Sequence, residues 1–175
     1  MDNLSSLVGK PLKWSVKGIF KPDWRLTYED RTVATLVTRK YHSLDREASY
    51  DGFQIQLLYN RKLDSMRIQN RTSGEAIGVI ENITVPVRIG NSFHYKWSIK
   101  CQNGLEYSVR GMPNEGSLFE DRQGRALSRT VFTPDYPQTS EFTLLHSDNL
   151  DINLWLMALI SHYYSMTIVA GSGAM

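Results

Sequence analysis

One segment near the end of this chain constrains the fold more than any other. Residues 150–170 are predicted to form a helix with apolar side chains on nearly every side, and no other stretch predicts a helix as clearly. Ser147 or Asp148 suits the N-cap, and Gly171 ends the helix. A helix that is apolar all round has to be buried all round. Either the preceding strands therefore enclose this helix or a membrane does.

The polar residues of the segment favour enclosure by protein over a tail anchor. A helix of about 20 residues is about 30 Å long and would match a bilayer core. No Lys or Arg flanks the segment, although basic residues normally mark the ends of a membrane span. Five polar side chains also interrupt it: Asn153, Ser161, His162, Ser165 and Thr167. We therefore expect a buried helix, with a tail anchor formed by 150–170 as the alternative.

Most of the remaining sequence alternates between apolar and polar residues with the period of a β-strand. The clearest example has Phe93, Tyr95, Trp97, Ile99 and Cys101 on one face. Further strands are predicted near residues 12–20, 24–29, 33–42, 53–59, 63–69, 76–83, 105–109, 117–121, 126–133 and 141–146. About eleven or twelve short strands separated by turns are typical of an antiparallel sandwich or barrel.

The strand count and the apolar helix fit one another. A barrel of about twelve strands, tilted by about 40°, is roughly 24 Å across its backbone. Side chains reduce that bore to roughly 10–14 Å, which is the width of one helix. The predicted fold is mainly β, a roughly twelve-stranded antiparallel barrel closed around a C-terminal central hydrophobic α-helix.

Three stretches share a local pattern, in which a strand runs into Asp or Asn, then Arg, a polar turn and an Ala that restarts a strand. They cover residues 28–34, 68–76 and 119–126. Asp and Asn suit turns because they bond their own backbone, and Gly supplies a positive φ. The pattern predicts three hairpins of similar build.

The many strands and the closing helix, entered through residues 147–151 (Ser-Asp-Asn-Leu-Asp) and continued by 156–160 (Leu-Met-Ala-Leu-Ile), resemble the tubby C-terminal-like superfamily. That group includes tubby domains, phospholipid scramblases, plant LURP-one-related proteins and small bacterial members. The resemblance covers about residues 10–170. It implies a barrel around a central helix and, in several members, contact with phospholipids.

Composition bounds the function. The net charge of +2 does not indicate a nucleic-acid partner, and a single cysteine, Cys101, excludes a site built from several thiolates. The N-terminus lacks the pattern of a signal peptide, so we expect a cytoplasmic protein, peripheral to a membrane where it binds one. We expect one domain over 1–170 and a frayed tail at 171–175.

The sequence contains no recognisable catalytic motif. The four histidines are far apart, and His162 is expected to be a satisfied core residue and Cys101 an inert core thiol. Asp148 and Asp151 could supply oxygen ligands to calcium, and the scramblase resemblance implies a calcium-responsive segment there. Helix capping explains the same two residues. We expect no cofactor and no enzymatic activity.

Two groups of basic residues are the candidate binding site for lipid phosphates. They are Lys13, Lys17 and Lys21 near the first strand, and Arg61, Lys62 and Arg67 around a hairpin. Solvated strand faces that discourage edge pairing are the simpler interpretation. The predicted function is a non-enzymatic binding or scaffold module that contacts anionic phospholipid or a protein partner. The alternatives are a carrier of a small apolar ligand and a tail-anchored membrane protein.

Overall fold

The computed structural model describes residues 4–17, 23–38, 45–50, 53–81, 86–89, 92–112, 115–135 and 139–146, together with Ile160, His162 and Tyr164. A short 3-10 helix, Leu4–Leu7, precedes thirteen strands. The strands are β1 Pro11–Lys17, β2 Asp23–Tyr28, β3 Arg31–Thr38, β4 Arg46–Tyr50, β5 Phe53–Asn60, β6 Ser65–Asn70, β7 Ala76–Glu81, β8 Pro86–Ile89, β9 Ser92–Cys101, β10 Glu106–Met112, β11 Gly116–Asp121, β12 Ala126–Phe132 and β13 Thr139–Leu144.

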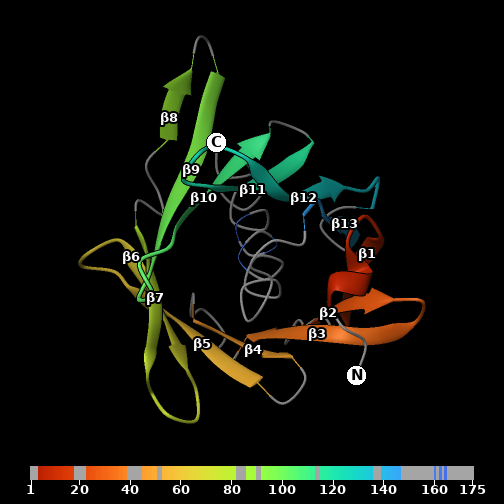
Figure 1. The fold of residues 1–175 in the computed structure, drawn as a ribbon, viewed down its shortest axis with the longest axis horizontal. Helices are drawn as coiled ribbons and strands as arrows, with labels where there is room; N and C mark the ends of the chain where they lie inside the picture. Colours follow the sequence, from red (N-terminus) through yellow and green to blue (C-terminus); the bar gives the residue numbers. More distant parts are fainter. Residues whose placement is uncertain are drawn as a thin grey trace.

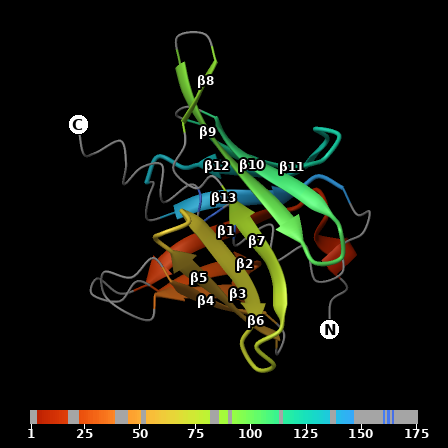
Figure 2. The same ribbon diagram turned by 90° about the vertical axis from the view of Figure 1, so that its left-hand side faces the viewer.

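Twelve of these strands form a closed antiparallel barrel (Figure 1). Each strand pairs with its neighbours along the chain, except that β7 pairs with β9, and β13 closes the ring against β1. Strand β8 pairs only with β9 among the described strands, and this hairpin extends beyond the barrel (Figure 2). The prediction of a mainly β fold and a twelve-stranded barrel is confirmed.

The alternating pattern places one face of each strand in the core. In β1, Leu12 and Trp14 are buried, whereas Pro11 and Lys13 are exposed. The largest fully buried side chains include Trp14, Trp97, Tyr164, Phe142, Leu26, Leu36, Ile55, Leu57 and Met66. Each such side chain contributes about 1.5–3 kcal/mol to folding, so the barrel interior is the main source of stability.

All three predicted hairpins are present, and all three contain a β-bulge near the turn. The register shifts in β2–β3, β6–β7 and β11–β12, which leaves Val33, Ile77 and Leu127 as the extra residues. A bulge bends its strand and increases its twist, as the closure of a barrel requires. The bulges therefore give the repeated sequence pattern a role in barrel curvature.

Turn side chains stabilise two of these hairpins. The Oδ1 atom of Asn70 accepts hydrogen bonds from the backbone N–H groups of Thr72 and Ser73. Asp121 Oδ1 accepts in the same way from Gln123 and Arg125. Partial burial raises the pKa of Asp121, but the hydrogen bonds and charge of Arg125 outweigh this and lower the pKa overall.

Some details of the strand prediction were wrong. Strands β4 and β8 were not predicted. The predicted strands 53–59 and 105–109 begin with the apolar residues Phe53 and Leu105, but these lie at the start of β5 and in the turn before β10 and are 50% and 36% exposed. Residues 18–20 and 39–42, expected in strands, lie outside the described residues.

Replacing Gly116 by alanine is expected to destabilise the barrel by about 3 kcal/mol or more. The new side chain would strain the backbone at this φ and would also clash with the backbone of the neighbouring strand β12. Gly116 opens β11 with φ 143°, and an added Cβ would lie 1.9 Å from the carbonyl oxygen of Thr130. Gly124→Ala is the matched control, because its φ is also positive, at 81°, but nothing lies within 4 Å. Urea unfolding measures both, and equal losses would contradict this account.

Candidate functional site

The inner wall of the barrel contains an aromatic and histidine cluster. His162 stacks on Trp14 of β1, with ring centroids 4.3 Å apart and planes at 14°. Trp24 of β2 meets the same ring edge-on at 4.4 Å. The Nδ1 atom of His162 lies 3.5 Å from Ser140 Oγ of β13, at the long limit of a hydrogen bond, and Nε2 has no partner among the described residues. His162 is therefore less fully satisfied than the sequence analysis predicted.

Burial controls the protonation of His162. It lowers the pKa of the imidazole to about 3, so the ring is neutral near pH 7. The described inward-facing residues nearest to it on β1, β2 and β13 are apolar or hydroxyl-bearing, so none supplies a compensating carboxylate. A general base works best with a pKa near the working pH and with access to substrate. This histidine has neither property, which favours a packing role.

Tyr164 packs against the opposite wall of the barrel. Its ring meets Trp97 of β9 edge-on, with centroids 4.7 Å apart. Its hydroxyl oxygen accepts a 2.9 Å hydrogen bond from the backbone N–H of Gly111 in β10. Gly111 lies beyond the last residue pair that β10 makes with β9, Arg110 with Lys96, so this N–H is available. In the ring, β9 is six strands away from β2, so residues 162 and 164 contact opposite sides of the bore.

The inner wall also carries a polar stripe that the sequence pattern did not predict. Ser117, Ser128, Thr130 and Ser140 are fully buried on β11, β12 and β13. The hydroxyls of Ser128 and Thr130 have no hydrogen-bond partner among the described residues. The signal was present in the alternation of Ser128 and Thr130 with exposed Arg129, but a pattern that counts only apolar residues passes over it. Such buried groups commonly bind internal water.

The barrel keeps the two predicted basic groups apart. Lys13 and Lys17 are exposed on β1. Arg61 and Lys62 lie in the β5–β6 turn and Arg67 is exposed on β6. Strands β2, β3 and β4 separate β1 from β5 around the ring, so these residues form two faces and not one patch. Lys21 lies outside the described residues.

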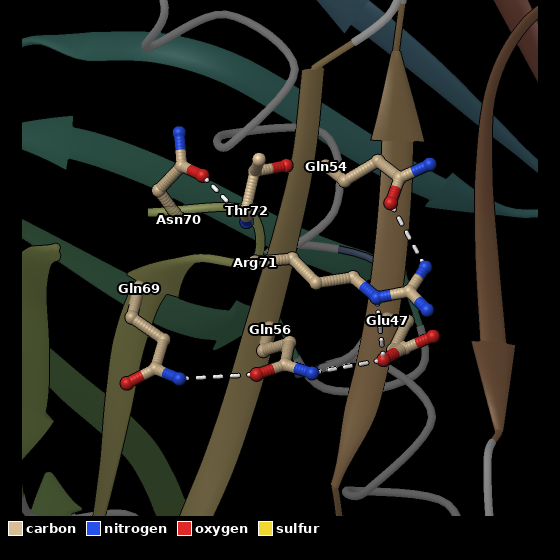
Figure 3. Close-up of polar contacts among 7 residues, drawn as sticks. All are labelled: Glu47, Gln54, Gln56, Gln69, Asn70, Arg71 and Thr72. Carbon is tan, nitrogen blue, oxygen red and sulfur yellow. Dashed lines mark hydrogen bonds and ion pairs between the residues drawn. The ribbon is translucent and has the colours of Figure 1, made fainter. Parts of the chain in front are cut away.

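The outer wall of β4–β6 carries a network of amides (Figure 3). Gln69 Nε2 donates to Gln56 Oε1, and Gln56 Nε2 donates to Glu47 Oε1, each at 3.0 Å. Arg71 Nε lies 3.4 Å from Glu47 Oε1, and its guanidinium also donates to Gln54 Oε1 at 2.8 Å. Glu47, Gln56 and Gln69 are direct cross-strand neighbours, so their hydrogen bonds help to fix the register of β4, β5 and β6.

The remaining candidate residues, the cysteine and the predicted calcium ligands, give little support to a catalytic or metal-binding site. Burial raises the pKa of the partly buried Cys101 thiol, which reduces its thiolate fraction. Asp148 and Asp151 lie outside the described residues. Within the described part of the chain, no three side chains of metal-ligating type gather at one place. None of the helices in that part is long and apolar enough to cross a bilayer.

No protein-family model and no curated protein sequence matches the chain. Among solved structures, it is similar to a protein from Arabidopsis thaliana, with a TM-score of 0.52 at 9% sequence identity. The match covers 90% of this chain and 94% of the plant protein. At this identity the likeness concerns the fold alone, and it extends over almost the whole of both chains.

Proposed function

We propose that this chain is a non-enzymatic binding module of tubby-like fold, which uses the outside of its barrel to contact an anionic phospholipid surface or a protein partner. Its C-terminal segment forms a central helix that fills the bore. The observation that carries the proposal is the seating of His162 and Tyr164 against opposite walls of the barrel.

Helical geometry accounts for those contacts. Successive residues of an α-helix are rotated by about 100°, so side chains two residues apart point in nearly opposite directions. His162 packs against β1 and β2, whereas Tyr164 packs against β9 and β10. Ile160, His162 and Tyr164 each have helical backbone and are almost completely buried. One helix along the barrel axis produces this arrangement.

A filled bore moves any ligand to the exterior. A carrier barrel keeps its interior free for an apolar ligand, but here the space between β2 and β9 holds the side chains of the chain itself. The same contacts disfavour a membrane anchor, because a segment seated between Trp14 and Trp97 cannot also lie in lipid. Tubby-like membership is supported by the ring of twelve strands together with this closing segment.

Liposome flotation tests the proposal. Binding of the full chain to vesicles containing anionic lipid is expected at low salt and is expected to fall as salt screens the charges. The double variant Arg61→Gln/Lys62→Gln is expected to weaken binding about thirtyfold, since each basic residue near the surface contributes about 1 kcal/mol. Lys13→Gln/Lys17→Gln tests the other basic face in the same way.

The control variant removes the same charge elsewhere. Lys10→Gln/Arg129→Gln alters one residue that lies over the Tyr28 ring and one that forms an ion pair with Glu115, both away from the β5–β6 turn. It is expected to bind vesicles like the unmodified chain. Absence of binding at low salt, or binding that is unchanged at high salt, would contradict the lipid part of the proposal.

A further inference from the structure

The outer face of β9, β10 and β11 contains a hollow of about 240 Å³. Its floor includes Ser98 of β9 and Ser108 of β10, which are direct cross-strand neighbours. Their short side chains lie between the longer side chains of Lys96, Lys100 and Glu106. The hollow is therefore a consequence of residue size at matched positions in the register.

Most charges around the hollow neutralise one another. Three ion pairs flank it: Lys100–Glu81 at 2.8 Å, Arg110–Glu120 at 2.7 Å and Arg122–Glu106 at 3.7 Å. Asp121, which also lines it, pairs with Arg125 at 3.0 Å. Lys96 lines the hollow and has no ion-pair partner within the described part of the chain. The surroundings therefore carry one excess positive charge.

The position of Lys96 concentrates that charge. Lys96 lies directly opposite Arg110 in the β9–β10 register, and like charges in such pairs repel. The Nε atom of Arg110 donates a hydrogen bond to the nearly buried carboxylate of Glu120. The hydroxyls of Ser98 and Ser108 form no hydrogen bond with another described residue. The Lys96 ammonium and the two serine hydroxyls thus line the hollow as potential donors, and Arg110 adds positive charge beside Lys96 in the register.

We propose that this hollow binds a phosphate group, either of a soluble phosphate ester or of a lipid headgroup. A phosphate has several acceptor oxygens arranged around one centre, which matches donors that come from two strands and from side chains of different length. Its negative charge relieves the repulsion between Lys96 and Arg110. The site is distinct from the basic faces at β1 and β5–β6, so it does not depend on them.

The test uses the full chain and two probes. Titration of inorganic phosphate, followed by amide resonances in an NMR spectrum, is expected to shift Ser98 and Ser108 saturably. Lys96→Gln is expected to weaken this binding at least about tenfold, since it removes a hydrogen bond to a charged group, and Lys96→Arg is expected to restore much of it. Lys10→Gln is the matched control, because Lys10 lies over the Tyr28 ring and far from this face.

Vesicles of phosphatidylcholine, with and without phosphatidic acid, distinguish the two sources of phosphate. A Lys96→Gln protein that loses phosphate binding but keeps vesicle binding indicates a soluble phosphate ester. Loss of both indicates a lipid headgroup. The proposal is overturned if phosphate produces no saturable shift at Ser98 and Ser108, or if Lys96→Gln and Lys10→Gln bind phosphate equally. Flotation that depends only on Arg61 and Lys62, together with a saturable phosphate shift that is lost in Lys96→Gln, would assign the hollow to a soluble phosphate ester and the lipid contact to the β5–β6 face.

Discussion

A chain that ends at His146 is expected to lose cooperative folding altogether. Such a chain keeps all thirteen strands but lacks the residues that pack against Trp14, Trp24 and Trp97. Removing one large buried aromatic side chain such as Tyr164 typically costs about 3–5 kcal/mol, and a domain of this size has about 5–15 kcal/mol in total. Near-UV circular dichroism and urea unfolding are the measurements.

Two further chains make that result specific. A chain that ends at Ala170 loses only residues 171–175, and it is expected to unfold with the same midpoint as the full chain. Tyr164→Phe keeps the ring beside Trp97 but removes the acceptor for the Gly111 N–H, and a loss of about 1–3 kcal/mol is expected. Cooperative unfolding of the chain ending at His146 would show that the barrel does not need its closing segment.

The barrel could be predicted from sequence because its main determinants are local. Alternation in strands such as β1 and β9 records which face is buried, since residues two apart point the same way. The hairpin signals are also local, because Asn70 and Asp121 bond backbone groups within four residues of themselves. The expected width of the bore, about that of one helix, then followed from the number of strands.

Two strands were missed for different reasons. In β4, Ala48 is the one fully buried residue among those whose side chains are described, so no apolar alternation marks the strand. Its register with β3 and β5 is fixed instead by polar neighbours, as where Thr35 Oγ1 and Ser49 Oγ lie 2.7 Å apart. Among the described strands, β8 pairs with β9 alone and stands outside the ring, so the barrel pattern does not require it.

The candidate sites were less predictable because they depend on closure of the ring. The pairing of β1 with β13 joins residues more than 120 positions apart, as in Leu12 with Phe142. Nothing local places Ser140 beside His162. For the same reason the two basic groups looked combinable in the sequence, and only the order of strands shows that they lie on separate faces.

Acid is expected to destabilise the barrel through His162. The residue titrates at a pKa of about 3 in the folded chain and near 6.5 when unfolded. Between these values the unfolded chain binds a proton on this ring and the folded chain does not, so stability falls as pH decreases. The contribution at pH 5 relative to pH 7.5 is about 2 kcal/mol, since each pH unit below 6.5 costs about 1.4 kcal/mol.

His162→Phe separates this effect from the titration of other groups. Phenylalanine keeps an aromatic ring between Trp14 and Trp24 but cannot be protonated. Carboxylates and the other histidines titrate in both proteins, so the difference between their pH dependences isolates His162. We expect urea unfolding to show a loss between pH 7.5 and 5 that is about 2 kcal/mol smaller in the variant. If His162→Phe does not fold, His162→Gln serves the same comparison. Equal losses in the unmodified and variant chains would mean that the imidazole is protonated inside the barrel, and that the cluster around it binds a compensating group.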